Sequence, residues 1–411
     1  MAYLGEQSQE CQRQTAIYKG IYTYAWDLID EGTVEAVARF RDVGLNTITL
    51  AAAYHAGKFI RPHGKSGKVY FPEDGTVYFR PDMGRYGAIK PTPASLLDDH
   101  DPFADIKAAA PDMRRVAWTV CMHNTALGQR YPEFTVRNAF GDDYPYSLCP
   151  AVPEVRDYIV TLCRDMAERQ ELDGVLLESP GFMPFDHGFH HKFFLLPMNR
   201  WAKWLLALCF APASIAGARA AGIDAERLAA DVRNRVEHFL ADPRQMPDSF
   251  AFEWMIADLI ANPEWGAFLR WRCDVVTSLV AEIRDALPKQ TELAVIPTVQ
   301  RPTAGCWLEG SDLAGLAKAA DALEVPAYQA NVTEVWHDTA DVRRRAGDDA
   351  RLHFILCPTH PDMRDGAETA AAAAALKEFG AEGLAFYNYG HFPLSGMERI
   401  REALAVFDDV A

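Results

Sequence analysis

The sequence lacks the marks of a secreted, disulfide-bonded or membrane-embedded protein. Its eight cysteines are scattered and form no Cys-x-x-Cys pair, so we expect reduced thiols. Residues 1–15 are polar and carry no basic segment followed by an apolar one, which argues against a signal peptide. The most apolar run, residues 201–213, is interrupted by Lys203 and is short for a membrane span. We therefore predict a cytoplasmic protein.

Positive charge is also scarce, with 41 Lys and Arg against 57 Asp and Glu and a formal net charge of −16. Binding to nucleic acid needs clustered basic side chains, so a nucleic-acid partner is not expected. The same acidic balance argues against an anionic membrane as partner. No glycine-rich phosphate turn follows the first predicted strand, and no G-x-S-x-G nucleophile elbow is present.

The sequence is rich in residues that can form a hydrophobic core, since 49% of the residues are hydrophobic and 11% are aromatic. A chain of 411 residues fits either two domains or one decorated α/β barrel. Short apolar runs alternate with stretches of helical periodicity along most of the chain. The predicted strands are 20–26, 46–53, 115–122, 174–178, 293–298, 322–328, 352–357 and 383–389.

Eight strands separated by helical segments predict a single (β/α)8 TIM barrel over residues 1–411, with a doubly wound sheet as the alternative. Two segments break the alternation. Residues 54–104 are rich in Gly and Pro and predict a long loop after strand two, with a hairpin pairing 68–71 with 76–79. Residues 189–265 are helical in pattern and predict an insertion after strand four.

In such a barrel the carboxyl ends of the strands meet at one mouth, where catalytic residues lie. The side chains expected there are aromatic or form hydrogen bonds. Flat aromatic faces stack on sugar rings, and polar groups bind hydroxyls, so we predict a small carbohydrate as the substrate. The predicted substrate-binding residues are Tyr24, Trp26, Asp27, His55, His123, Asn124, Trp307, Tyr328, His360, Tyr387, Asn388 and Tyr389.

Glycoside hydrolysis usually requires two carboxyl groups. Glu178 ends the fourth strand and is the first candidate, with a structural ion pair as the alternative interpretation. Glu309, in the loop after strand five, and Glu324, inside strand six, are the candidates for the second. Glu309 is alternatively a solvated loop acid, and Glu324 an internal hydrogen-bonding residue. Asp186 and Asp27 are weaker candidates.

Metal chemistry is the rival possibility, because residues 186–191 read Asp-His-Gly-Phe-His-His. These are ligand types that zinc or a redox metal uses, but their spacing matches no recognised ligand motif. We expect a hydrogen-bonding loop there, with no metal and no cofactor. Cys357 and His360 form another conceivable pair, but closeness in sequence does not establish a nucleophile beside its base.

The run from Cys149 to Tyr158 (C-P-A-V-P-E-V-R-D-Y), followed by Asp173 to Glu178 (D-G-V-L-L-E), resembles the glycoside-hydrolase-like barrels found in many bacteria. The resemblance covers residues 146–180 and implies a (β/α)8 barrel whose strand-four acid lies in the active site. This chain departs from the family pattern in three ways. Cys149 stands where Asn is usual, Glu178 replaces the commoner Asp, and residues 179–182 lack the aromatic-rich segment.

We therefore predict a glycoside hydrolase that acts on a small glycoside or oligosaccharide through a pair of carboxylates. A metal-dependent sugar isomerase or lyase and a non-catalytic carbohydrate-binding barrel are the alternatives. Exposed apolar helices in the insertion would favour a homodimer.

Overall fold

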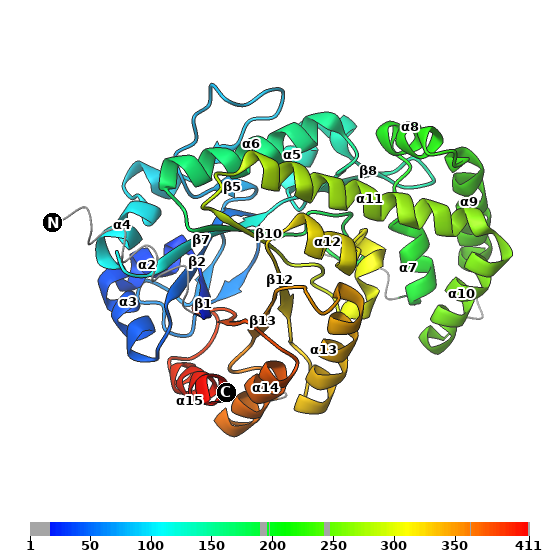
Figure 1. Ribbon diagram of the computed structural model, residues 1–411. Coiled ribbons are helices and arrows are strands. Elements are labelled where there is room, and N and C mark those ends of the chain that lie inside the picture. Colours follow the sequence, from blue (N-terminus) through cyan, green and yellow to red (C-terminus); the bar gives the residue numbers. More distant parts are fainter. Residues whose placement is uncertain (1–16, 190–194, 197, 242–246, 362, 410–411) are drawn as a thin grey trace.

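A computed structural model describes residues 17–409 except 190–194, 197, 242–246 and 362. Eight parallel strands form a closed barrel, because β1 pairs with both β2 and β14 (Figure 1). The predicted (β/α)8 fold is therefore confirmed. The barrel strands are β1 (Tyr18–Thr23), β2 (Thr47–Tyr54), β7 (Arg114–Val120), β10 (Gly174–Glu178), β11 (Glu292–Val295), β12 (Ala322–Pro326), β13 (Leu352–Leu356) and β14 (Gly383–Phe386).

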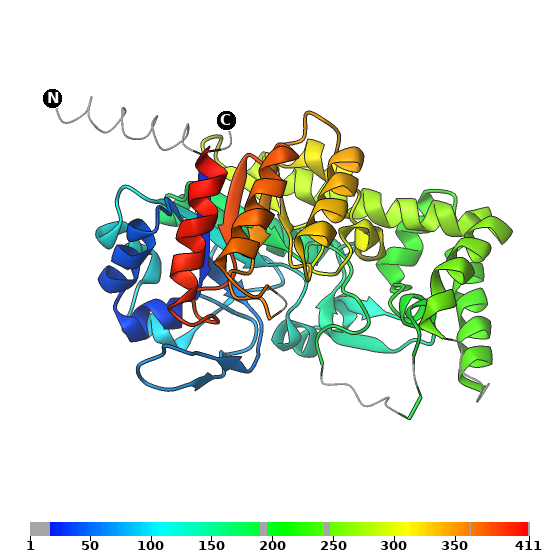
Figure 2. The same ribbon diagram turned by 90° about the horizontal axis from the view of Figure 1, so that it is seen from below.

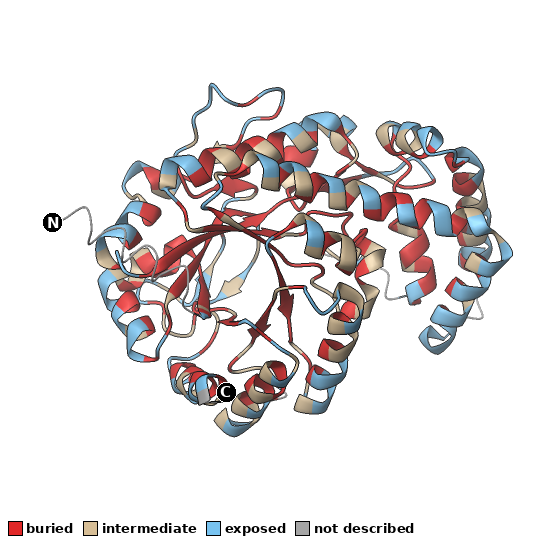
Figure 3. Cartoon of the chain, in the orientation of Figure 1, coloured by how far each residue is buried: buried red, intermediate tan, exposed pale blue. Residues whose placement is uncertain are grey.

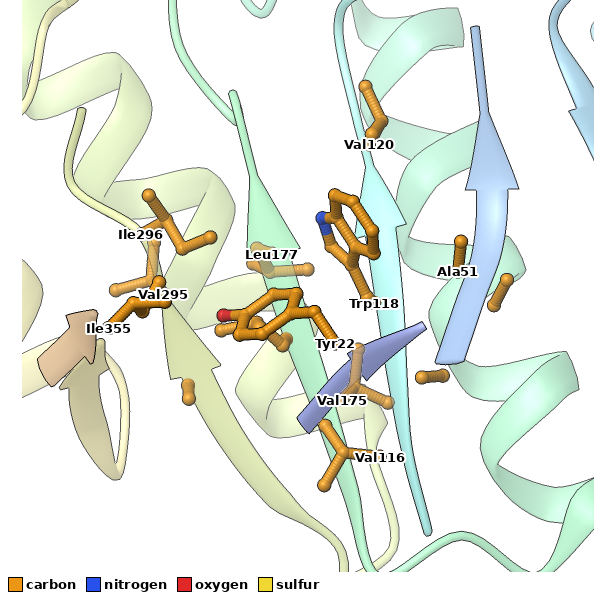
Figure 4. Close-up of a cluster of buried hydrophobic side chains, with 14 of the residues drawn as sticks. Tyr22, Ala51, Val116, Trp118, Val120, Val175, Leu177, Val295, Ile296 and Ile355 are labelled. Atoms are coloured by element: carbon orange, nitrogen blue, oxygen red, sulfur yellow. The ribbon is translucent and has the colours of Figure 1, made fainter. Parts of the chain in front are cut away.

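The strands are apolar along their whole length because both of their faces are covered. Every residue of β2, β12 and β13 is buried, as is usual for parallel strands with helices outside. Inside the barrel, Tyr22 packs edge-on against Trp118 at a centroid distance of 5.2 Å, and both lie among the aliphatic side chains of β10 and β7 (Figure 4). The barrel interior is therefore a packed core rather than a channel.

The outer helices turn apolar faces inward and charged faces to solvent (Figure 3). In α6 (Pro153–Gln170), Pro153 sits in the first turn, and Val155, Ile159 and Leu162 are buried on the face turned toward the barrel. The helices that follow the barrel strands are α2 (Ala25–Glu31), α3 (Thr33–Asp42), α4 (Pro102–Ala109), α6 (Pro153–Gln170), α11 (Pro263–Ala286), α12 (Leu313–Ala319), α13 (Val332–Ala346), α14 (Gly366–Glu378) and α15 (Gly396–Asp409).

Five strands end two or three residues earlier than their apolar runs suggested. β1 stops at Thr23, and α2 begins at Ala25, so Trp26 and Asp27 lie on a helix and not at a strand end. The other four are β7, β11, β12 and β14. The apolar runs continue because the loops beyond the strands are themselves buried, and hydrophobicity does not distinguish a buried loop from a strand.

The hairpin predicted in the loop after β2 is wrong. Strand β3 (Phe59–Ile60) pairs with β4 (Val69–Tyr70). Strand β5 (Thr76–Val77) instead pairs antiparallel with β2 and parallel with β6 (Thr92–Pro93). Gly75 adopts a positive φ of 64°, and the preceding Asp74 accepts a hydrogen bond from Ala56 N at 3.0 Å. This turn directs the chain back along β2 instead of toward 68–71.

Two further segments lie between barrel strands. After β7 come α5 (Thr125–Arg130) and the hairpin of β8 (Thr135–Arg137) with β9 (Asp143–Leu148). After β10 come α7 (Arg200–Leu206), α8 (Pro212–Ala220), α9 (Ala225–Ala241) and α10 (Ala251–Ala261), which with the start of α11 enclose a second hydrophobic core. Seen from the side, the loop after β2 and the hairpin after β7 project from the same end of the barrel (Figure 2). In the part of the chain described, no helix has the length and apolarity needed to cross a bilayer.

Candidate active site at the mouth of the barrel

Glu178 is the last residue of β10, and its side chain is partly exposed at the mouth. Its Oε2 accepts a hydrogen bond of 2.5 Å from the indole Nε1 of Trp118. The strand register places Trp118 beside Leu176, two residues below Glu178, so the indole reaches up to the carboxyl group. Burial raises the pKa of Glu178 to about 7, and the Trp118 hydrogen bond acts in the opposite direction. A carboxyl group with such a pKa exchanges a proton readily at neutral pH.

Tyrosine hydroxyls gather next to Glu178. The hydroxyl of Tyr24 lies 3.0 Å from that of Tyr54 and 3.4 Å from that of Tyr387, and 3.2 Å from Nε2 of His391. Burial raises the pKa of Tyr54 and of Tyr387, and the charge of Glu178 raises each further. The carboxyl group of Glu178 therefore borders a cluster of aromatic rings with hydroxyl tips.

Glu309 lies on the neighbouring side of the mouth, at the end of the 3-10 segment η4 (Thr303–Glu309). Its Oε1 accepts a hydrogen bond of 2.5 Å from Thr298 Oγ1, just beyond β11. Its backbone oxygen accepts one of 2.9 Å from Phe182 N in the loop that follows Glu178. The loops after β10 and β11 therefore bring the two acids to adjoining positions.

Electrostatics links the two carboxyl groups. Glu309 is only 4% exposed, and burial raises its pKa to about 8. The Glu178 charge raises that pKa further, while the Thr298 hydrogen bond and the cations of Arg301 and Arg272 lower it. The protonated form of Glu309 is therefore favoured by burial and by the neighbouring charge of Glu178.

Glu324 lies deeper, within the barrel core. Its Oε1 accepts hydrogen bonds from Tyr22 at 2.6 Å and Tyr18 at 3.1 Å, and its carboxyl group is 4.0 Å from His353 Nδ1. It is 1% exposed, and burial raises its pKa to about 7. The charges of Arg114 and Glu292, which stand at the opposite end of the barrel, also act on it. This position fits the alternative interpretation of Glu324 as an internal hydrogen-bonding residue.

Three histidines from different loops meet at the rim. His55 stacks on His123 at a centroid distance of 4.0 Å, and His123 lies 4.9 Å from His187. Burial lowers the pKa of all three, to about 4 for His55 and about 2 for His123, so they are neutral at physiological pH. Across the described residues, no three His, Cys, Asp or Glu side chains are grouped as metal ligands. His190 and His191 lie outside the described residues.

No protein-family model matches this chain, and no curated protein matches it. Among solved structures, it is similar to a β-galactosidase from the psychrophilic Marinomonas ef1, with 12% identity and a TM-score of 0.56 over 95% of this chain and 59% of the other. It is also similar to the catalytic domain of a β-amylase from Paenibacillus polymyxa, with 11% identity and a TM-score of 0.56 over 96% of this chain and 98% of the other. At this level of identity, the similarity to both structures shows a shared fold. Both neighbours are glycoside hydrolases, and this chain spans less than two thirds of the galactosidase.

Several predicted site residues have their polar groups engaged within the protein. Asp27 Oδ1 accepts from Arg61 at 2.8 Å, and Asn124 caps α5 by accepting from Leu127 N at 2.9 Å. The Tyr389 hydroxyl donates to Glu31 at 2.8 Å. Trp307 packs against Trp204 of the insertion, at a centroid distance of 6.0 Å. These contacts give Asp27, Asn124, Tyr389 and Trp307 clear structural roles.

Of the other predicted residues, Trp26 and Asn388 have buried polar atoms without a hydrogen-bond partner among the described residues, and Tyr328 and His360 lie after β12 and β13. Trp26 stacks on Tyr24 at 4.3 Å, and its indole nitrogen has no hydrogen-bond partner among the described residues. Asn388 Nδ2 is likewise buried without a partner in the described part of the chain. Tyr328 packs against Tyr387 at 5.7 Å. His360 lies in the turn after β13, where its backbone N–H donates to Cys357 O at 3.2 Å.

Three residues of the mouth were missed by sequence reasoning. Trp118 and Tyr54 had a usable signal, since Tyr54 directly follows the predicted second strand and Trp118 has the period-two spacing of Val116 and Val120 in the third. Arg301 lies in an irregular loop after β11, and only its three-dimensional neighbours reveal its place.

Proposed function

We propose that this chain is a glycoside hydrolase acting on a small glycoside or oligosaccharide, with Glu178 and Glu309 as its two carboxyl groups. The observation that carries the proposal is the position of Glu178, at the carboxyl end of β10 and in contact with Trp118. Catalytic residues of α/β barrels occupy this end of the strands. The second acid on the adjoining loop supplies the partner that the reaction needs.

The chemistry follows from the protonation states of the two acids. Hydrolysis needs one protonated carboxyl group to protonate the leaving oxygen and one ionised group to attack or to activate water. Burial raises the pKa of both acids, and the charge of Glu178 raises that of Glu309 further, which favours a protonated Glu309 beside an ionised Glu178 near neutral pH. The stereochemistry depends on their separation. A gap of about 5 Å gives retention, and about 6.5–9.5 Å leaves room for water and gives inversion.

The walls of the mouth suit a sugar. Tyr24, Tyr54 and Tyr387 offer rings and hydroxyls together, and the neutral His55 and His123 can donate or accept hydrogen bonds. A sugar ring has apolar faces and a polar edge, so it matches aromatic rings that carry polar tips.

The test is hydrolysis of a panel of aryl α- and β-glycosides by the wild type and by Glu178→Gln, with a chelator present. We expect turnover of at least one glycoside, reduced by about 10²-fold or more in the variant. Full activity in Glu178→Gln would overturn the role of Glu178. Activity that requires a dialysable metal would favour the isomerase or lyase alternative. Sugar binding with no turnover of any glycoside would favour a carbohydrate-binding barrel.

A further inference from the structure

Arg301 carries an unpaired guanidinium group beside the proposed catalytic acids. Its Nη1 donates to the backbone oxygen of Gln300 at 2.5 Å. Its Nε and Nη2 are buried, and neither has a hydrogen-bond partner among the described residues. These two nitrogens form one edge of the guanidinium plane, and that edge matches the two oxygens of a carboxylate.

The nearby acids are already satisfied by other donors. Asp338 accepts hydrogen bonds from Thr303 N at 2.9 Å, from Thr303 Oγ1 at 2.6 Å and from Gln329 Nε2 at 2.5 Å. Glu309 accepts from Thr298, and no ion pair joins either acid to Arg301 within the described residues. Burying a cation without an ion-pair partner costs free energy, and an anionic ligand that bound these two nitrogens would offset that cost.

Arg301 also belongs to the mouth by contact. Its guanidinium carbon lies 4.8 Å above the ring of Tyr328, and Tyr328 packs at 5.7 Å against Tyr387. The charge of Arg301 acts on Glu309, and that of Glu178 acts on Tyr328. An anion on Arg301 would therefore belong to a ligand seated between β11, β12 and the two acids.

We propose that Arg301 is a specificity-determining residue that binds the carboxylate of a hexuronic acid, so that the substrate is an acidic glycoside. This inference rests on the proposed hydrolase function and narrows its substrate class. The chain as a whole is acidic, with a net charge of −16, and would repel an anion at long range. Salt screens that repulsion beyond about 8 Å, whereas a paired and desolvated contact at Arg301 persists.

The test measures binding to Glu178→Gln, in which hydrolysis is suppressed. The probes are matched aryl glycosides of both anomers: glucuronide against glucoside and galacturonide against galactoside. We expect at least one acidic member to bind about 10-fold or more tightly than its neutral match, and high salt to leave this preference in place because the Arg301 contact is desolvated. Equal binding of every pair, or no binding of any acidic member, would overturn the inference.

Variants of Arg301 in the same background identify the residue. Arg301→Gln should abolish the preference for the acidic member, and Arg301→Lys should retain only part of it, because lysine lacks the two-nitrogen edge. The control is Arg270→Gln, which removes an exposed cation ion-paired with Asp312 at 2.9 Å and should leave the preference unchanged. An unchanged preference in Arg301→Gln, with a wild-type circular dichroism spectrum, would overturn the assignment. If Arg301→Gln does not fold, the proposal is still tested by the binding of the matched glycoside pairs and by the reduced preference expected in Arg301→Lys.

The two proposals fail separately. Turnover of neutral glycosides without any acidic preference would retain the hydrolase and reject the role of Arg301. Arg301-dependent binding of a uronide that the wild type never hydrolyses would retain the anion site and reject the hydrolase.

Discussion

The indole N–H of Trp118 and the carboxyl group of Glu178 are joined by a hydrogen bond of 2.5 Å at the mouth of the barrel. This contact stabilises the ionised form and lowers the pKa of Glu178, although burial has the larger effect and raises that pKa to about 7. The ring of Trp118 also packs against Tyr54 at a centroid distance of 5.0 Å and against Tyr387 at 5.8 Å. The same indole therefore hydrogen-bonds to Glu178 and packs against the neighbouring tyrosines.

Replacing Trp118 by Phe keeps a ring in place and removes the donor. The pKa of Glu178 should rise, so the limb of the pH–rate profile that reports this acid should move to higher pH. We expect kcat/KM at pH 7 to fall by roughly 10-fold, in line with the loss of about 1.5 kcal/mol from one hydrogen bond to a charged group. Trp336→Phe, at a tryptophan that is 44% exposed, is the control and should leave the profile unchanged. An unmoved limb in Trp118→Phe would contradict the role of the indole.

Glu324 should affect stability and not catalysis. Burial raises the pKa of Glu324 from an ordinary value of 4.5 to about 7, so the folded state binds an extra proton between those pH values. Stability should therefore fall as pH rises from about 4.5 to 7, by about 3 kcal/mol for this group. Glu324→Gln removes the titration and should flatten this dependence in urea unfolding while changing kcat by less than about 2-fold. A loss of activity above 10² in the correctly folded variant would instead place Glu324 in the chemistry.

The barrel was predictable because each strand is a short apolar run followed by a helical pattern, and parallel strands require such crossovers. The position of Glu178 was predictable because it ends one of these strands. A carboxylate at the end of a buried strand costs free energy unless it is solvated or paired. The depth of Glu324 was indicated by its place inside strand six, which is why an internal hydrogen-bonding residue was the alternative interpretation. Glu178 ends β10, whereas Glu324 is followed by two further residues of β12.

Long-range pairings explain the other differences. Asp27 was expected at the mouth because the apolar run of β1 continues to Trp26, but the chain turns into α2 and meets Arg61 from the distant loop. Nothing local in the sequence pairs residue 27 with residue 61. The same holds for Arg301, whose significance arises from its neighbours Tyr328 and Glu309.

Arg61 should act as the clamp of the loop after β2. Its side chain is 5% exposed and pairs with Asp27 at 2.8 Å and Asp30 at 2.7 Å. Arg61→Gln leaves the buried Asp27 carboxyl group without its cation, which should cost about 3–5 kcal/mol of unfolding free energy. The exposed pair of Arg41 and Asp112 is the control, and Arg41→Gln should cost less than about 1 kcal/mol. Urea unfolding measures both, and equal costs for the two variants would contradict the clamp.

Glu309 decides whether the chain has a catalytic pair or a single acid. If it acts with Glu178, Glu309→Gln should lower kcat on an aryl glycoside by about 10²-fold or more, because one of the two proton or nucleophile roles is lost. Glu398→Gln, at a glutamate whose side chain is 63% exposed, is the matched control and should retain wild-type kcat. The anomer released by the wild type, followed by NMR, then reports retention or inversion and hence the working separation of the carboxyl groups. Wild-type kcat in a folded Glu309→Gln variant would remove this residue from the pair and leave Glu178 to act with a group supplied by the substrate or by water.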